Sequence, residues 1–121
     1  MDRVRYLHHN GERILYLDFS KFPNPRDAEE HIARAREVID KEPANNSLRT
    51  LTNVEDTAFD AGMAQSLWKL AKANKPYVRA AAVVGITGAK ATLLKLVQSM
   101  SGREFAVFKD VEAAKHWLSK R

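Results

Sequence analysis

The chain alternates short apolar stretches with longer stretches in which apolar residues recur every three or four positions. Residues 3–8 and 12–19 alternate between apolar and polar or run apolar, and Asn10-Gly11 lies between them. Asn-Gly is the strongest short-range hairpin signal, because both turn residues must tolerate a positive φ. The pattern therefore predicts an antiparallel pair of strands at the start of the chain.

Four later segments have the spacing of one helix face. Asn24 and Asp110 are suited to cap the first and last helices, Pro25 fits a first helical turn, and Gly102 fits a helix end. The predicted inward residues are Ala28, Ile32, Ala35, Val38 and Ile39; Phe59, Met63, Leu67, Leu70 and Ala71; Leu93, Leu96, Val97 and Met100; and Val111, Ala114, Trp117 and Leu118.

Strands are predicted between the helices, at residues 47–54, 78–86 and 103–110. Apart from Arg79, residues 78–86 form a run of mostly small apolar residues, which is typical of a strand buried on both faces of a parallel sheet. The order predicts an α/β fold in a single domain, residues 1–121. An opening β-hairpin is followed by alternating helices and strands, giving a mostly parallel five-stranded sheet.

The composition fits one globular domain, with 121 residues of which 45% are hydrophobic and 29% charged. There is no cysteine, which excludes disulfides, zinc ribbons and a cysteine nucleophile and suits a reducing cytosol. The first residues carry no apolar signal segment, and residues 80–86 fall far short of the ~20 apolar residues of a membrane span. We therefore expect a cytoplasmic protein without membrane insertion.

The charge is unevenly distributed along the chain. Residues 1–60 hold nine Lys/Arg and twelve Asp/Glu, a net charge of −3, whereas residues 61–121 hold eleven and three, a net charge of +8. Such asymmetry can mark a surface for an anionic partner, although a solvated basic surface is the simpler interpretation. No run of Lys/Arg interleaved with aromatic residues is present, so nucleic-acid binding is not expected.

A glycine turn, residues 85–88, follows the buried strand. It is too short for the phosphate loop of nucleotide hydrolases, and the dinucleotide fingerprint needs a third glycine that is missing. Turn chemistry is therefore the first interpretation, with Thr87 as a candidate cap. The alternative is an anionic or lipid-like ligand at the carboxyl ends of the parallel strands, with Asn53, Gly85, Thr87 and Gly88 as its contacts.

No set of residues predicts catalysis, a metal or a cofactor. His8 and His9 are neighbours on a strand and point to opposite faces, and His31 and His116 lack a histidine at i+4. Glu55, Asp56 and Asp60 cluster before a helix, where carboxylates are favoured electrostatically in any case. Trp68 falls off the centre of its helix stripe, which suits either an exposed interface anchor or a cover at the edge of the core.

Taken together, the element order and five stretches of sequence resemble a known family. The stretches are "LRTLTNV", "FDAGM", "NKPYVRAAAVVGITG", "SGREFAVF" and "EAAKHWL". They resemble the bacterial STAS-like proteins related to the sporulation anti-anti-sigma factor, and more narrowly the stand-alone members grouped with both STAS and CRAL-TRIO-type lipid-carrier domains. The resemblance spans essentially the whole chain.

The resemblance implies a non-enzymatic switch that binds a partner kinase or transporter. In the anti-sigma antagonists of this family a serine is phosphorylated at the start of the helix after the third strand. Aligned on Gly62, that serine becomes Asp60 here and the next position is Ala61. The phosphorylatable hydroxyl is thus replaced by a constant negative charge. The lipid-carrier relatives imply an apolar pocket beneath a mobile helix, but the apolar residues of this chain look fully used by the core.

These observations predict a regulatory or scaffolding module, not an enzyme, that needs no cofactor or metal. A protein partner, a kinase or another signalling protein, would bind the loop and helix of residues 56–72, with contacts from Asp56, Thr57, Asp60, Gly62, Trp68 and Lys72. Self-association into a homodimer through the same helix is an open alternative. The identity of the partner or ligand is not encoded in any motif.

Overall fold

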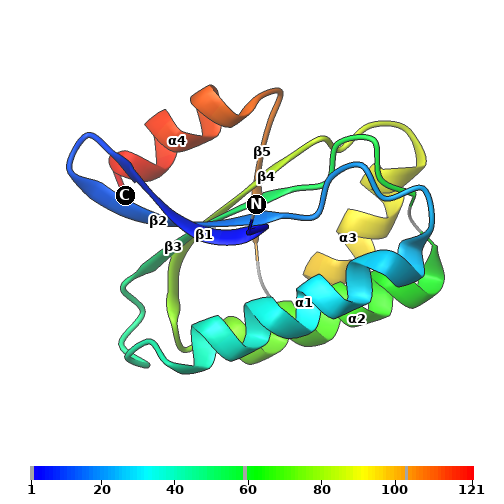
Figure 1. Ribbon diagram of the computed structural model, residues 1–121, viewed down its shortest axis with the longest axis horizontal. Helices are drawn as coiled ribbons and strands as arrows, with labels where there is room; N and C mark the ends of the chain where they lie inside the picture. Colours follow the sequence, from blue (N-terminus) through cyan, green and yellow to red (C-terminus); the bar gives the residue numbers. More distant parts are fainter. Residues whose placement is uncertain (1, 59, 103) are drawn as a thin grey trace.

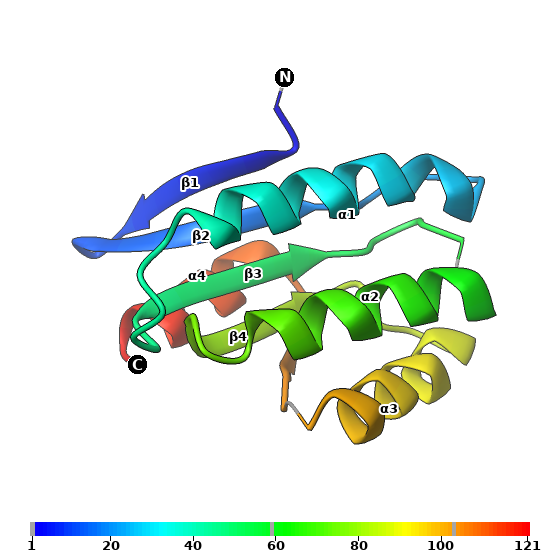
Figure 2. The same cartoon turned by 90° about the horizontal axis from the view of Figure 1, so that it is seen from below.

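A mixed β-sheet with helices on both faces makes up the protein (Figures 1 and 2). The computed structural model describes residues 2–58, 60–102 and 104–121. In these ranges the elements are β1 (Val4–His9), β2 (Glu12–Asp18), α1 (Pro25–Asp40), β3 (Leu48–Asn53), α2 (Ala61–Asn74), β4 (Val78–Val84), α3 (Ala89–Ser101), β5 (Ala106–Phe108) and α4 (Val111–Ser119). The strands lie in the order β1-β2-β3-β4-β5, with β1 and β2 antiparallel and the later pairs parallel. The predicted fold class is confirmed.

The opening hairpin forms as its turn residues require. Asn10 and Gly11 have φ angles of 52° and 80°. This left-handed backbone pairs His9 with Glu12 and sets the register that places Leu7 opposite Ile14.

Three predicted caps are confirmed at the helix ends. Asn24 Oδ1 accepts a hydrogen bond from the Arg26 amide at 3.1 Å, and Asp110 Oδ1 accepts one from the Ala113 amide at 2.8 Å. Gly102 ends α3 in the left-handed conformation with a φ of 69°. The prediction that Thr87 caps α3 is wrong, because the cap position is Gly88, at a φ of 56°, and no side chain bonds the first turn.

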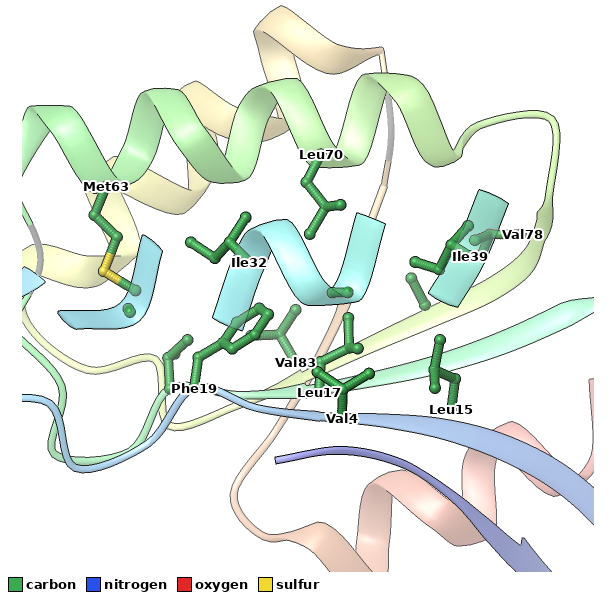
Figure 3. Packing of buried hydrophobic residues seen from close by; sticks show 14 of the residues in the cluster. Val4, Leu15, Leu17, Phe19, Ile32, Ile39, Met63, Leu70, Val78 and Val83 are labelled. Atoms are coloured by element: carbon green, nitrogen blue, oxygen red, sulfur yellow. The ribbon is translucent and has the colours of Figure 1, made fainter. Parts of the chain in front are cut away.

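The larger core lies between the sheet and helices α1 and α2 (Figure 3). β4 contributes Ala81 and Val83 to this core and turns Ala82 and Val84 to the opposite face. The opposite face is covered by α4 through Ala114 and Leu118 (Figure 1). The prediction that this strand is buried on both faces is confirmed.

Helix α3 differs from the prediction in the side chains that it buries. It lies beside α2, its main contact, and makes few contacts with the sheet (Figure 2). Val97 is therefore buried, whereas Leu96 and Met100, predicted to point inward, are 48% and 51% exposed. A stripe of apolar residues shows which side of a helix is apolar, but not how much of that side a neighbour covers.

The last strand is shorter than predicted, since β5 has only three residues and Lys109 already lies in the bend before the cap of α4. Two predicted positions, Phe59 in the core stripe and Arg103 at the start of the strand, lie outside the described residues.

Candidate functional site

The N-terminus of α2 presents a carboxylate at the surface. Asp60 precedes the helix in an extended conformation, and its Oδ1 accepts a hydrogen bond from the Met63 amide at 2.8 Å. Asp60 and Gly62 are both exposed. A methyl group built on Gly62 would lie 3.4 Å from Asp60 Oδ1, which is van der Waals contact. Because glycine has no such group, this side of the carboxylate stays uncovered. The cap therefore fixes a negative charge at the place where the sequence predicts a partner contact.

The loop before α2 is held from within by Thr57, which is only 2% exposed. The Thr57 hydroxyl donates to the Phe19 carbonyl oxygen at 2.6 Å and accepts from the Phe22 amide at 3.2 Å. Its neighbour Asp56 is exposed and has a left-handed backbone with a φ of 54°. Of the two predicted contacts in this loop, Asp56 thus faces solvent, while Thr57 shapes the loop and does not present its side chain.

Trp68 lies at the junction of α2 and α3. It is half-buried and packs beside the small cluster of Ala64, Ala71 and Val97 that joins the two helices. The exposed Lys72 places its Nζ 5.9 Å from the centroid of the indole ring. Trp68 therefore covers the edge of a core cluster and is only partly exposed, and its role as an interface anchor stays a prediction.

The predicted partner contacts do not form one tight cluster. Asp60 and Gly62 lie at the N-terminus of α2, whereas Trp68 and Lys72 lie two to three turns further along. At about 1.5 Å of rise per residue, Gly62 and Lys72 are separated by roughly 15 Å along the helix axis. The exposed or half-buried members of the set are thus spread along α2 and the loop before it.

The glycine turn after β4 brings two loops into backbone contact. Gly85 has a φ of 95°, and a methyl group built on it would lie 2.5 Å from the backbone nitrogen of Glu55. No residue with a side chain fits between these loops without moving one of them. A glycine is therefore required here for the close approach of the two loops.

A polar cleft of about 450 Å³ opens beside this contact, at the carboxyl ends of β3 and β4. Lys90 lies in its wall, with Nζ 2.7 Å from the Val54 carbonyl oxygen and 3.4 Å from that of Gly85. Burial lowers the pKa of Lys90, and the nearby carboxylates of Asp56 and Glu55 oppose that shift. The cleft is lined by Pro23, Glu55, Asp56, Thr57, Ala58, Gly85, Thr87, Lys90 and Lys109.

Asn53, predicted as a ligand contact in this region, is engaged inside the protein. Its Nδ2 donates to the Tyr16 hydroxyl at 2.9 Å, and its Oδ1 accepts from the Glu55 amide at 2.9 Å. The residue is 7% exposed and does not line the cleft. The structure thus brings Gly85 and Thr87 to the cleft, with Lys90 and Lys109, which the sequence did not single out. Lys109 is 19 positions from Lys90 in the sequence, which hides its place in this group.

An apolar cavity of about 50 Å³ lies between the sheet and helices α2 and α3. Its walls include Phe19, Leu67, Leu94, Val97 and Phe105, with Thr50, Thr52 and Asn74 as polar members. Pockets that enclose small organic ligands usually measure about 300–1,000 Å³. The cavity is therefore much too small to enclose an acyl chain in this conformation.

Within residues 2–58, 60–102 and 104–121, no three His, Asp or Glu side chains gather as ligands for a metal ion. None of the helices described there has the length and apolar character that crossing a bilayer requires.

One comparison with known proteins gives a match. A family model described as SpoIIAA-like matches residues 14–119 of the 121-residue chain. No curated protein and no solved structure matches the chain.

Proposed function

The chain belongs to the SpoIIAA-like family of STAS-like regulatory domains, and we propose that it is a non-enzymatic module that captures a signalling protein through residues 56–72. Domains of this anti-anti-sigma type are regulatory and bind protein partners such as kinases. The present protein would use the loop after β3 and the exposed side of α2 for the same purpose.

The observation that carries this proposal is the exposed carboxylate of Asp60 at the N-terminus of α2. In the antagonists that this chain resembles, the corresponding position carries a serine, which is negatively charged only while it is phosphorylated. Asp60 bears a fixed charge that the helix cap holds in place. The negative charge at this position would therefore be constant. Binding would be controlled by the partner or by the amount of this protein in the cell.

The test is capture of partner proteins from a lysate of the host cell on immobilised protein, quantified by mass spectrometry. We expect the double variant Asp60→Lys, Trp68→Ala to lose the proteins that the wild type enriches. Glu37→Lys, an exposed charge change on α1, is the matched control and should retain them. Because Trp68 is half-buried, circular dichroism and thermal melting must show that the double variant is folded; a folded variant with unchanged capture would refute the proposal.

A second candidate function is the binding of a small anion at the carboxyl ends of β3 and β4. It is favoured by Lys90 and Lys109 in the wall of the polar cleft and by the start of α3, which has no side-chain cap. Glu55 and Asp56 in the same wall oppose it. Titration with inorganic phosphate, followed by NMR of the amides of residues 85–90, tests it: saturable shifts that Lys90→Met abolishes support an anion site, and unchanged spectra exclude it.

A further inference from the structure

The outer side of the α2–α3 pair carries exposed apolar residues that no part of the described chain covers. Leu96 and Met100 are one helical turn apart on α3 and are among the most exposed large apolar side chains of the described residues. With Val97 and Trp68 they line a hollow of about 200 Å³ between the two helices, here called the α2–α3 groove. Its remaining lining residues are Ala61, Ala64 and Gln65.

Two neighbouring helices form the walls of this groove. α2 and α3 lie side by side and run in the same direction (Figure 2). Small residues of α2, Ala64 and Ala71, meet Val97 between the helices. Because these side chains are short, the helices approach closely at that point, while the larger Trp68, Leu96 and Met100 stand at the groove.

Positive charge gathers at the C-terminal end of α2, next to the groove. The sequence contains no Asp or Glu from residue 61 to residue 103, whereas α2 alone carries Lys69 and Lys72, and Lys75 follows at its C-terminal cap. All three lysines are exposed. A methyl group built on Gly102 would lie 3.5 Å from Lys75 Nζ, which places this ammonium group at the C-terminal end of α3. One end of the groove is therefore rimmed with positive charge.

We propose that the α2–α3 groove binds an acidic amphipathic helix of a protein partner. Apolar side chains of such a helix would enter the hollow between Trp68, Leu96 and Met100, and its carboxylates would meet Lys72 and Lys75. The inference rests on the proposed function and adds to it α3, which lies outside residues 56–72, and the chemistry of the partner. A hollow between two parallel helices receives protruding side chains, whereas a bilayer presents a flat surface, so the shape favours a helix over a membrane.

The test uses a defined probe. A synthetic peptide of about 18 residues carries Leu at helical i, i+3, i+4 and i+7 spacing and Glu on its other face, and a second peptide replaces Glu by Lys. We expect saturable binding of the acidic peptide, detected by NMR shifts at Trp68, Leu96 and Met100 and by Trp fluorescence, and at least about tenfold weaker binding of the basic peptide.

Two variants separate the apolar and charged contributions. Leu96→Gln with Met100→Gln introduces residues of good helix propensity, so α3 should stay helical. The affinity for the acidic peptide should fall by about tenfold or more. Lys72→Gln with Lys75→Gln should weaken binding of the acidic peptide and remove most of its dependence on salt. Val107→Gln, at an exposed apolar residue of β5, and Lys95→Glu, at an exposed lysine of α3, lie outside the groove lining and should change the affinity less than about twofold.

Three outcomes would overturn the inference. The first is equal affinity for the acidic and the basic peptide, or an affinity for the acidic peptide that Leu96→Gln with Met100→Gln leaves unchanged. The second is binding of phosphatidylglycerol vesicles without binding of the acidic peptide, which would assign the groove to a membrane. The third is concentration-dependent dimerisation that shifts the groove residues in the absence of peptide binding. The lysate experiment keeps the two proposals apart: if Leu96→Gln, Met100→Gln retains the captured proteins that Asp60→Lys, Trp68→Ala loses, the groove inference fails and the proposed function stands.

Discussion

Lys90, in the first turn of α3, reaches back across the chain and donates a hydrogen bond to the carbonyl oxygen of Val54 at 2.7 Å. This contact joins the end of β3 to the start of α3, two places that are 36 residues apart. It also places an ammonium group beside Asp56 and Glu55, in the wall of the polar cleft. Lys90 therefore connects the loop proposed to meet a partner with the helix that forms one side of the groove.

Replacing Lys90 by Met should lower the free energy of unfolding by about 1–2 kcal/mol, because the Val54 carbonyl oxygen loses its donor while the alkyl stem is kept. Urea denaturation followed by circular dichroism measures the change. Lys95→Met, at an exposed lysine of the same helix, is the control and should stay within about 0.5 kcal/mol of the wild type. Equal effects of the two substitutions would show that the bond to Val54 contributes nothing.

The same residue predicts a pH dependence. Burial lowers the pKa of Lys90 in the folded protein from its usual 10.5. Between the lowered pKa and 10.5 the unfolded chain binds more protons than the folded chain, so the contribution of Lys90 to stability rises with pH in that window. The difference in unfolding free energy between wild type and Lys90→Met should therefore be larger at about pH 10 than at about pH 8, while the other titrating groups cancel in the comparison. A difference that falls with pH would contradict the assigned direction.

Gly85→Ala should destabilise the protein by roughly 2–4 kcal/mol, since the new methyl group would meet the Glu55 backbone at 2.5 Å in a left-handed conformation. Gly11→Ala is the matched control. Gly11 also has a positive φ, 80°, but nothing lies within 4 Å of the added methyl group, so only the backbone strain of about 1–2 kcal/mol is expected. Thermal and urea unfolding of both variants isolate the cost of the collision.

Thr57→Val should cost about 1–3 kcal/mol, because it keeps the shape of the side chain and removes the hydroxyl that bonds Phe19 and Phe22. The loop would be loosened without any change to its surface charges. Hydrogen exchange at the Phe22 and Ala58 amides should accelerate relative to the rest of the sheet. Thr92→Val, at an exposed threonine of α3, serves as control; the same acceleration there would point to a general loss of stability.

Two substitutions of Asp60 separate the effect of its charge from the effect of its hydrogen bond as a helix cap. Asp60→Asn keeps a side-chain oxygen for the Met63 amide and should change stability by only a few tenths of a kcal/mol, whereas Asp60→Ala should cost about 1 kcal/mol. If the partner recognises the charge, both variants lose capture in the lysate experiment. If Asp60→Asn captures as well as the wild type, the carboxylate acts as a helix cap and its charge is not recognised.

The fold could be predicted because its signals are local. Asn10-Gly11, the caps at Asn24 and Asp110, and the apolar run of β4 each specify their element within a few residues. The groove could not be predicted, because Leu96 and Met100 have the same spacing as buried residues and only the position of α3 beside α2 leaves them exposed.

The contacts between the loops could not be predicted from the sequence, for a related reason. Gly85 and Glu55 are 30 positions apart, so the close approach that requires a glycine leaves no trace in the local pattern. Thr87 looked suited to cap a helix, but the positive φ of Gly88 gives the cap position to the glycine. Thr57 and Asn53 are polar residues in a predicted site whose hydrogen bonds turn out to be internal. Sequence patterns gave the elements around this region, whereas the assignment of each side chain to surface or interior needed the tertiary structure.

The single short helix on one face of the sheet has a consequence for synthesis in the cell. Ile14, Tyr16, Leu51, Ala82 and Val84 come from three different strands, and in the described chain α4 is the helix that packs on them. During translation, α1 and α2 can close over their side of the sheet while these apolar residues still face water. The nascent chain therefore exposes an apolar surface until residues 111–119 have left the ribosome. A delay in their release would prolong the time in which chaperones and other nascent chains can bind this surface.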